Sequence, residues 1–193
     1  MRYAIISVLT LLCVFVLATG CGRHGDDGGP CVCGATNWGR YTPPGAGFTV
    51  LIPPTPRVRL TTNQIASGTI IITNHVTDVG TVVAFVIAQN GFPPNVNVQD
   101  KAVLFASARM GALGQDGKMI AERPLSQGGW PGVEWKFEKF GGQAIITMRA
   151  FLVGREMFQA AAIMPKNKVC SMHVAKFLDS FEIQRKPVAL KPK

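Results

Sequence analysis

Apolar residues recur at every second position along much of this 193-residue chain, which is the spacing of half-buried β-strands. The runs are rich in β-branched and aromatic residues and end at Gly, Pro, Asn or Asp. They predict a strand at 48–53, a hairpin of 69–73 and 81–88 that turns at 78–80, and a meander of strands at 118–125, 132–140, 144–153 and 157–164. Residues 54–68 are expected to form a loop. In the second meander strand Val133, Trp135 and Phe137 alternate with charged residues, so one side is expected to be buried.

Two segments have the spacing of helices. Residues 102–110 form an apolar run with little charge, for which Asn97 or Asp100 is a plausible N-cap. An amphipathic helix is predicted over 168–181, because its apolar residues recur at helical spacing: Cys170, Val174, Phe177, Leu178 and Phe181. The order of strands and helices predicts an α+β fold, with an antiparallel β-sheet packed between helices in an αβα sandwich.

The N-terminus has the pattern of an export signal. Arg2 precedes an apolar run at 4–17 that is too short to span a membrane. The run ends in the letters LATGC, which resemble the lipobox of bacterial lipoproteins, so we expect a lipoprotein signal peptide at 1–20 and a diacylated Cys21. Ordinary signal peptidase could also cleave here and leave Cys21 as a free thiol. Gly22 favours the periplasmic side of the outer membrane in a Gram-negative cell.

Residues 21–45 are rich in Gly, Pro and Asp and predict a flexible tether. With Cys21 acylated, the thiols of the mature chain are Cys31, Cys33 and Cys170, an odd number in an oxidising compartment. One disulfide between tether and domain is expected, although Cys170 also suits a small buried core residue. A C-x-C pair with one distant cysteine lacks the usual spacing of zinc ligands, so neither a metal nor another cofactor is predicted.

The charge favours anionic partners. The chain has 20 Lys and Arg against 11 Asp and Glu, a net charge of +9, and loss of residues 1–20 removes Arg2 alone. Nucleic acid is not expected for an exported protein whose aromatic residues are not interleaved with basic ones. The expected partners are the membrane, through the lipid anchor, and an unidentified envelope protein or anionic polymer. The basic tail at 184–193 could also contact anionic lipid.

The residues offer little support for an enzyme. His24, His75 and His173 are isolated, and no nucleotide-binding, zinc-protease or nucleophile-elbow motif is present. The carboxylates of the meander are expected to form cross-strand ion pairs with their basic neighbours; the acids are Glu122, Glu134, Glu138 and Glu156, and the bases Lys136, Lys139 and Arg149. We therefore expect a non-catalytic binding or assembly module. The alternative is an envelope hydrolase, or a thiol-redox or metal protein using Cys31, Cys33 and Cys170.

The segment 128–132 is the best candidate for a recognition loop. Trp130 follows two glycines and precedes Pro131, a setting that disfavours a strand ladder, and exposed tryptophan is common in binding hot spots. Arg149 and Arg155 are the basic residues expected at the same contact. The alternative for Trp130 is that it covers the end of the core.

Several stretches together resemble a known family. The pattern G-x-P-G-x-E at 129–134, the run RAFLVGREMFQ at 149–159 and the closing FLDSF at 177–181 are similar to bacterial PsbP-like lipoprotein domains, which are related to an extrinsic subunit of the photosystem. The resemblance covers residues 46–183. It implies an antiparallel sheet between helices and a binding or assembly role, and it brings no catalytic residues.

Overall fold

The computed structural model describes residues 37–54, 56–80 and 83–185. The strands in these residues are β1 Gly39–Tyr41, β2 Phe48–Ile52, β3 Arg57–Ile65, β4 Gly68–Val79, β5 Val83–Gly91, β6 Lys118–Gln127, β7 Trp130–Lys139, β8 Ala144–Val153, β9 Glu156–Pro165 and β10 Glu182–Ile183. The helices are α1 Lys101–Leu113 and α2 Ser171–Ser180, with a 3₁₀ turn at Lys166–Lys168 just before α2.

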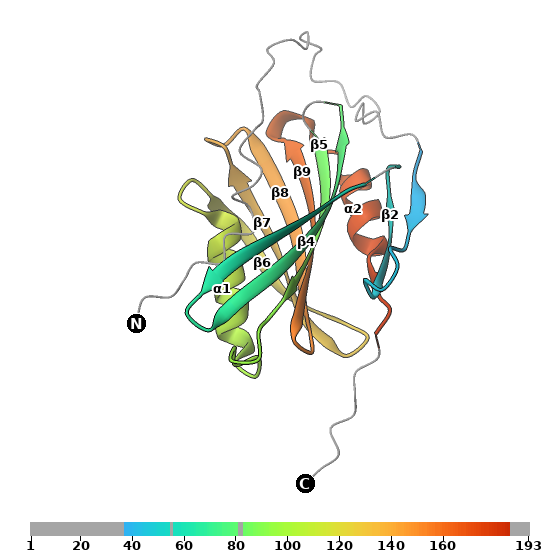
Figure 1. Cartoon of the computed structure of the whole chain (residues 1–193). Helices are drawn as coiled ribbons and strands as arrows, with labels where there is room; N and C mark the ends of the chain where they lie inside the picture. The colour runs from blue at the N-terminus through green and yellow to red at the C-terminus, as the bar shows by residue number, and fades with distance from the viewer. Residues whose placement is uncertain (1–36, 55, 81–82, 186–193) are drawn as a thin grey trace.

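A large antiparallel sheet forms the middle of the molecule (Figure 1). Its strand order is β3-β4-β5-β9-β8-β7-β6, and every neighbouring pair is antiparallel. The predicted hairpin is β4 with β5, and the predicted meander is β6 to β9. A second, three-stranded sheet has the order β1-β2-β10 and joins strands from the two ends of the described chain.

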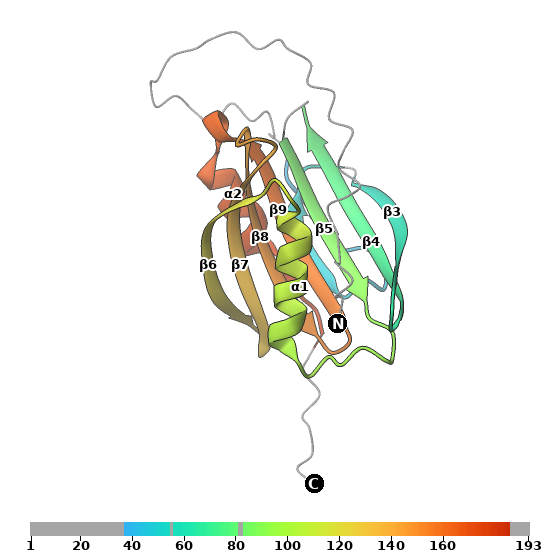
Figure 2. The ribbon, with the colours of Figure 1, turned by 90° about the vertical axis from the view of Figure 1, so that its left-hand side faces the viewer.

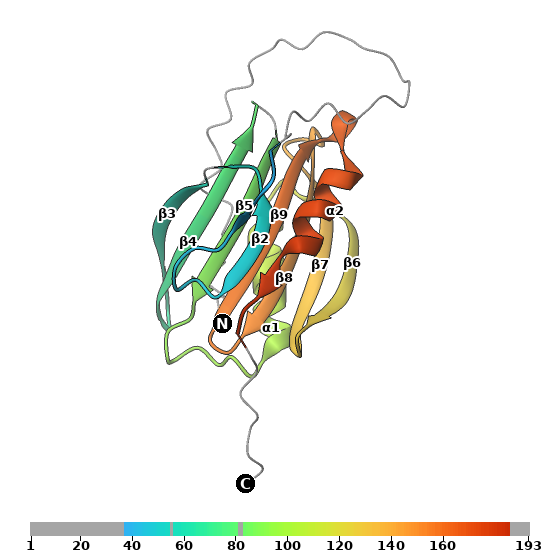
Figure 3. The ribbon, with the colours of Figure 1, turned by 90° about the vertical axis from the view of Figure 1, so that its right-hand side faces the viewer.

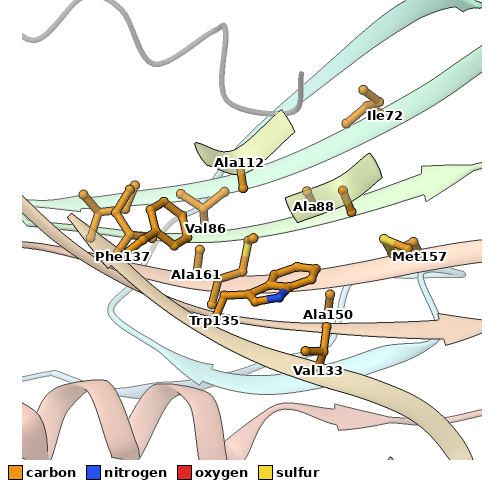
Figure 4. Packing of buried hydrophobic residues seen from close by; sticks show 14 of the residues in the cluster. Ile72, Val86, Ala88, Ala112, Val133, Trp135, Phe137, Ala150, Met157 and Ala161 are labelled. Atoms are coloured by element: carbon orange, nitrogen blue, oxygen red, sulfur yellow. The ribbon is translucent and has the colours of Figure 1, made fainter. Parts of the chain in front are cut away.

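Helix α1 covers one face of the large sheet (Figure 2). Its buried positions are small or aliphatic, namely Leu104, Ala108, Gly111 and Ala112. Beneath them the sheet presents Ala88, Ala150 and Ala161 beside the fully buried Trp135 (Figure 4). Small residues on both surfaces let the helix approach the sheet closely, and Trp135 fills the remaining space.

Helix α2 and the small sheet together cover the opposite face (Figure 3). This layer is strongly aromatic. Phe181 stacks with Phe151 at a centroid distance of 6.1 Å and lies 5.6 Å from Phe48, while Phe85 and Phe177 are 5.0 Å apart. Aromatic rings contribute large buried areas, so this second layer is a substantial core in its own right.

The structure corrects the expected loop at 54–68. Residues 57–65 form β3, an edge strand in which most side chains are exposed or half-buried. In its sequence RVRLTTNQI apolar and polar residues alternate only briefly, at Val58 and Leu60, which are both exposed, so the pattern is too short to identify a strand. Helix boundaries also differ slightly from the prediction. Asp100 caps α1 by accepting from the Val103 N–H, and α2 begins at Ser171 instead of 168.

The boundaries of the folded part also differ from those expected. Gly39–Tyr41 lies inside the predicted tether, yet it forms β1 and pairs with β2. At the other end, the Gln184 N–H donates to the Gly47 carbonyl oxygen at 2.9 Å, so the first residues of the predicted tail belong to the fold. The predicted signal peptide, Cys21 and residues 186–193 of the tail lie outside the described residues.

Gly132 offers a test of the packing beneath α2. A Cβ at this position of β7 would lie 2.4 Å from the Phe151 ring and 2.8 Å from the Ala150 carbonyl oxygen. We expect Gly132→Ala to lower the free energy of unfolding by about 1–3 kcal/mol in urea denaturation, because the strand must move to relieve the clash. Gly39→Ala is the control, since a Cβ there meets nothing within 4 Å. Equal effects of the two substitutions would contradict this packing.

Candidate functional site

Arg149, one of the predicted recognition residues, joins three elements. It lies on β8 directly opposite Glu134 of β7, and its Nε donates to a Glu134 carboxylate oxygen at 2.7 Å. Its Nη1 donates to the Leu178 carbonyl oxygen at 2.8 Å and its Nη2 to the Asp179 carboxylate at 2.7 Å, both near the end of α2. The side chain is 16% exposed. Arg149 therefore fastens the C-terminal end of α2 to the sheet, and its pair with Glu134 is one of the cross-strand ion pairs expected in the meander.

Glu134 is held ionised by two arginines. Burial alone would raise the pKa of this carboxyl group, but hydrogen bonds from Arg123 and Arg149 outweigh burial and leave the pKa below its ordinary value. Each arginine takes a different carboxylate oxygen, both at 2.7 Å. With both oxygens engaged and the proton disfavoured, the group fits a structural anion better than a general acid.

Trp130 is the first residue of β7 and is half-buried against the aromatic layer under α2. Trp130 and Pro131 both pair with β6, which corrects the expectation that they would stand outside a ladder. The indole N–H donates to the Arg185 carbonyl oxygen at 2.9 Å. Arg185 in turn donates to the Glu156 carboxylate at 2.5 Å and lies 5.6 Å from the centre of the Phe158 ring. Trp130 thus helps to hold the end of the described chain.

Arg155 lies in the turn between β8 and β9 and is exposed. Its guanidinium donates to the carbonyl oxygens of Pro93 and Val96, in the loop before α1. Trp130 and Arg149 lie on the α2 face of the sheet, whereas Arg155 reaches toward the segment that leads to α1. The four predicted recognition residues are therefore not gathered into one patch, and contact with a partner through them stays a prediction.

The other acidic residues of the meander also have basic partners, although most differ from those expected. Glu122 pairs with Arg109, Glu138 with Lys166 and Glu156 with Arg185. Lys139 is buried and donates to Asp116 and to the Leu113 carbonyl oxygen, both at 2.5 Å. Lys139 therefore donates to a carbonyl oxygen at the C-terminal end of α1 and does not pair with a carboxylate on a neighbouring strand. A hydrogen bond from Lys139 is also the main cause of the lowered pKa of Asp116.

His75 is buried, although the sequence, in which it is an isolated histidine just after the predicted strand 69–73, did not predict this. His75 lies within β4 beneath the small sheet and is 3% exposed. Its Nδ1 is 2.9 Å from the Tyr41 hydroxyl, and its ring lies 5.4 Å from that of Phe48. Burial holds its pKa below the ordinary value of 6.5, so the neutral ring is favoured. The polar letters TNHVTD that surround it gave no signal of burial.

Cys170 is disulfide-bonded and 1% exposed, so it is both a disulfide partner and a core residue. Cys31 and Cys33, its predicted partners, lie outside the described residues, and their pairing with Cys170 stays a prediction. Close by on α2, the His173 ring lies 5.6 Å from that of Trp38. Tyr41 and Trp38 both contact the aromatic layer and so fasten the start of the domain.

Within the described ranges, no cluster of three or more His, Cys, Asp or Glu side chains could hold a metal ion. No helix in the same ranges is both long and apolar enough to cross a membrane.

Comparison with known proteins identifies the fold. No protein-family model and no curated protein matches the chain. Among solved structures it is similar to cyanobacterial PsbP from Synechocystis sp. PCC 6803, with a TM-score of 0.51 and 11% identity, covering 84% of this chain and 99% of that one. A Pseudomonas aeruginosa protein of unknown function, titled a putative regulator, has a TM-score of 0.42 and 10% identity, covering 81% and 97%. The chain has a PsbP-like fold of mostly antiparallel sheet with two helices, as the sequence motifs predicted.

Replacement of Arg149 tests its role as the fastening between α2 and the sheet. We expect Arg149→Met to lower the free energy of unfolding by about 1–3 kcal/mol, because Glu134 loses one of its two donors in a partly buried site. Arg123→Met removes the other donor, but Arg123 is 59% exposed, so its loss should cost less than about 1 kcal/mol. Urea denaturation of both variants measures the difference. An effect of Arg123→Met as large as that of Arg149→Met would argue against this role.

The lowered pKa of His75 predicts that the stability of the protein depends on pH. Because its folded pKa is lowered, the unfolded chain binds a proton more readily, so the stability falls as the pH drops below about 6.5. We expect His75→Phe to reduce the loss of melting temperature between pH 7.5 and pH 5.5. The control is Thr77→Val, a buried position on the same strand that removes no titratable group, and it should leave the slope as in the wild type. An unchanged slope in His75→Phe would show that His75 does not govern it.

Proposed function

We propose that this protein is an exported bacterial lipoprotein, anchored to the cell envelope through a diacylated Cys21. Its PsbP-like domain, with the sheet between α1 and α2 as an αβα sandwich, acts as a non-catalytic binding or assembly module. The partners are the membrane, through the anchor, and an envelope protein or anionic polymer. In a Gram-negative cell, Gly22 after the lipidated cysteine favours the periplasmic side of the outer membrane.

The disulfide at Cys170 is the observation that carries this proposal. Disulfides form and persist in oxidising compartments such as the periplasm and the cell surface, and they are rare in the cytosol. Cys170 is disulfide-bonded within a buried aromatic layer. This agrees with the apolar leader at 4–17, which is typical of exported chains. Two independent features, one in the leader and one in the domain, therefore favour export.

The chemistry of the charged residues supports binding or assembly over catalysis. Glu134 has both carboxylate oxygens engaged and a lowered pKa, and Arg149 uses three of its donors on β7 and α2. A general acid or base needs a pKa near the working pH and access to substrate. These side chains instead fasten one element to another.

The anchor can be tested by the intact mass of the protein extracted from membranes. We expect a chain that begins at Cys21 and carries the added mass of a diacylglyceryl group. Alkylation without reduction should modify one thiol, and alkylation after reduction should modify three, because one disulfide is expected among Cys31, Cys33 and Cys170.

The matched control is Cys21→Ser, which should abolish acylation and leave the alkylation pattern of the three other thiols unchanged. A wild-type mass with an unmodified Cys21 would overturn the lipid anchor. Such a protein would be exported without acylation and would have four thiols available after reduction, and the thiol-redox alternative would gain weight.

A further inference from the structure

The surface at the start of α2 combines exposed apolar side chains with positive charge. Val169 is 37% exposed and Met172 is 64% exposed. Around them lie Lys166, Lys168 and Lys176, also exposed, and the sequence from 165 to 178 contains no acidic residue. We call these five residues the α2 entry surface. Glu138 of β7 faces it, and its carboxylate accepts from Lys166 at 2.6 Å.

The chain enters the domain at this same surface. Trp38 is the second described residue, and its ring lies against His173 of α2. The Lys176 ammonium group stands 5.0 Å from the centre of the Trp38 ring, within the range of a cation–π contact. The disulfide-bonded Cys170 lies between Val169 and Met172 in sequence. The start of the described chain and the disulfide therefore both meet the beginning of α2.

The position of the predicted anchor restricts what this surface can face. Cys21 precedes Trp38 by 17 positions. Even a fully extended chain of that length spans no more than about 60 Å, so a lipid on Cys21 would keep Trp38, and the α2 entry surface beside it, within about that distance of the bilayer. A disulfide from Cys170 to Cys31 or Cys33 would shorten the path further, to 10 or 12 positions from Cys21.

We propose that the α2 entry surface is a second membrane contact, which docks on anionic phospholipid headgroups. This rests on the proposed function, since it assumes an anchor at Cys21. Lysine side chains near an anionic bilayer are attracted by its surface potential, and Val169 and Met172 are placed to enter the boundary between headgroups and acyl chains. The two acyl chains of a diacylated Cys21 would already hold the protein on the membrane, so this surface would serve to orient the domain against the bilayer.

Two other places in the described part of the chain also expose large apolar side chains beside basic residues. Val58, Leu60 and Ile71 lie on β3 and β4, where the neighbouring Arg57 is paired with Asp78. Val103 and Met110 lie on α1, which covers the opposite face of the large sheet (Figure 2), and Ile120 lies on the edge strand β6. The α2 entry surface is distinguished by the entry of the chain beside it, at Trp38.

The test uses the mature chain from residue 21 with Cys21→Ser, so that no acyl group contributes to binding. Binding to vesicles of 30% phosphatidylglycerol in phosphatidylcholine is measured by flotation and compared with pure phosphatidylcholine. We expect binding to the anionic vesicles that falls as NaCl is raised. The triple variant Lys166→Gln, Lys168→Gln, Lys176→Gln should weaken the partition coefficient about tenfold, and Met172→Ser should weaken it about threefold.

The control is a second triple variant, Arg57→Gln, Arg59→Gln, Lys101→Gln, which removes the same charge from exposed positions away from α2. It should retain at least half of the wild-type partition coefficient, and circular dichroism of every variant confirms folding. Equal losses in the two triple variants would reveal general charge attraction and overturn the proposal, as would absence of binding to anionic vesicles. Because the intact mass tests the anchor separately, failure of this surface and failure of the lipoprotein proposal are distinguishable.

Discussion

The central strands of the large sheet are apolar on both faces, and the rest of the fold follows from this constraint. In β9 every residue from Met157 to Met164 is buried, and β5 and β8 are buried along nearly their whole lengths. A strand of this kind is stable only when both faces are covered, because an uncovered face would leave large apolar area in water. The sheet therefore needs a covering layer on each face, and we call these two layers the covers. The edge strands β3 and β6 lie beyond the covers and are mostly exposed.

The two covers are built in different ways. The first is local: α1 lies in sequence between β5 and β6 and packs back on small residues of the same sheet. The second is assembled from both ends of the described chain, with β1 and β2 from one end and α2 and β10 from the other. Such a cover has a larger loop-closure cost and needs fastenings. Arg149, the Trp130 to Arg185 hydrogen bond and the Gln127 contacts to Phe181 and Ile183 supply them.

The difference between these covers explains what could be predicted from the sequence. A strand with one buried face, such as β7 with Val133, Trp135 and Phe137, shows its period of two directly, and the strands buried on both faces, β5 and β9, are nearly continuous apolar runs. The edge strand β3 has no buried face, and its alternation at Val58 and Leu60 is too short to distinguish it from a loop. The Glu134 to Arg149 pair was predictable because both residues lie on adjacent strands. The hydrogen bond of Trp130 was not predictable, because its partner Arg185 is 55 positions away in a segment that the sequence predicts to be a tail.

The aromatic and charged residues that stand out in the sequence hold elements of the fold together. Trp130, Arg149 and Glu134 form hydrogen bonds that hold the second cover on the sheet. A search of the sequence for conspicuous aromatic and charged residues therefore finds residues that stabilise the fold. The side chains of Val169 and Met172 instead remain exposed on the outer side of that cover. The cover brings Trp38, near the start of the described chain, against α2 beside this surface. With the proposed anchor on Cys21, the lipid and the proposed contact surface would form one bivalent attachment, in which the lipid supplies local concentration and the lysines supply orientation.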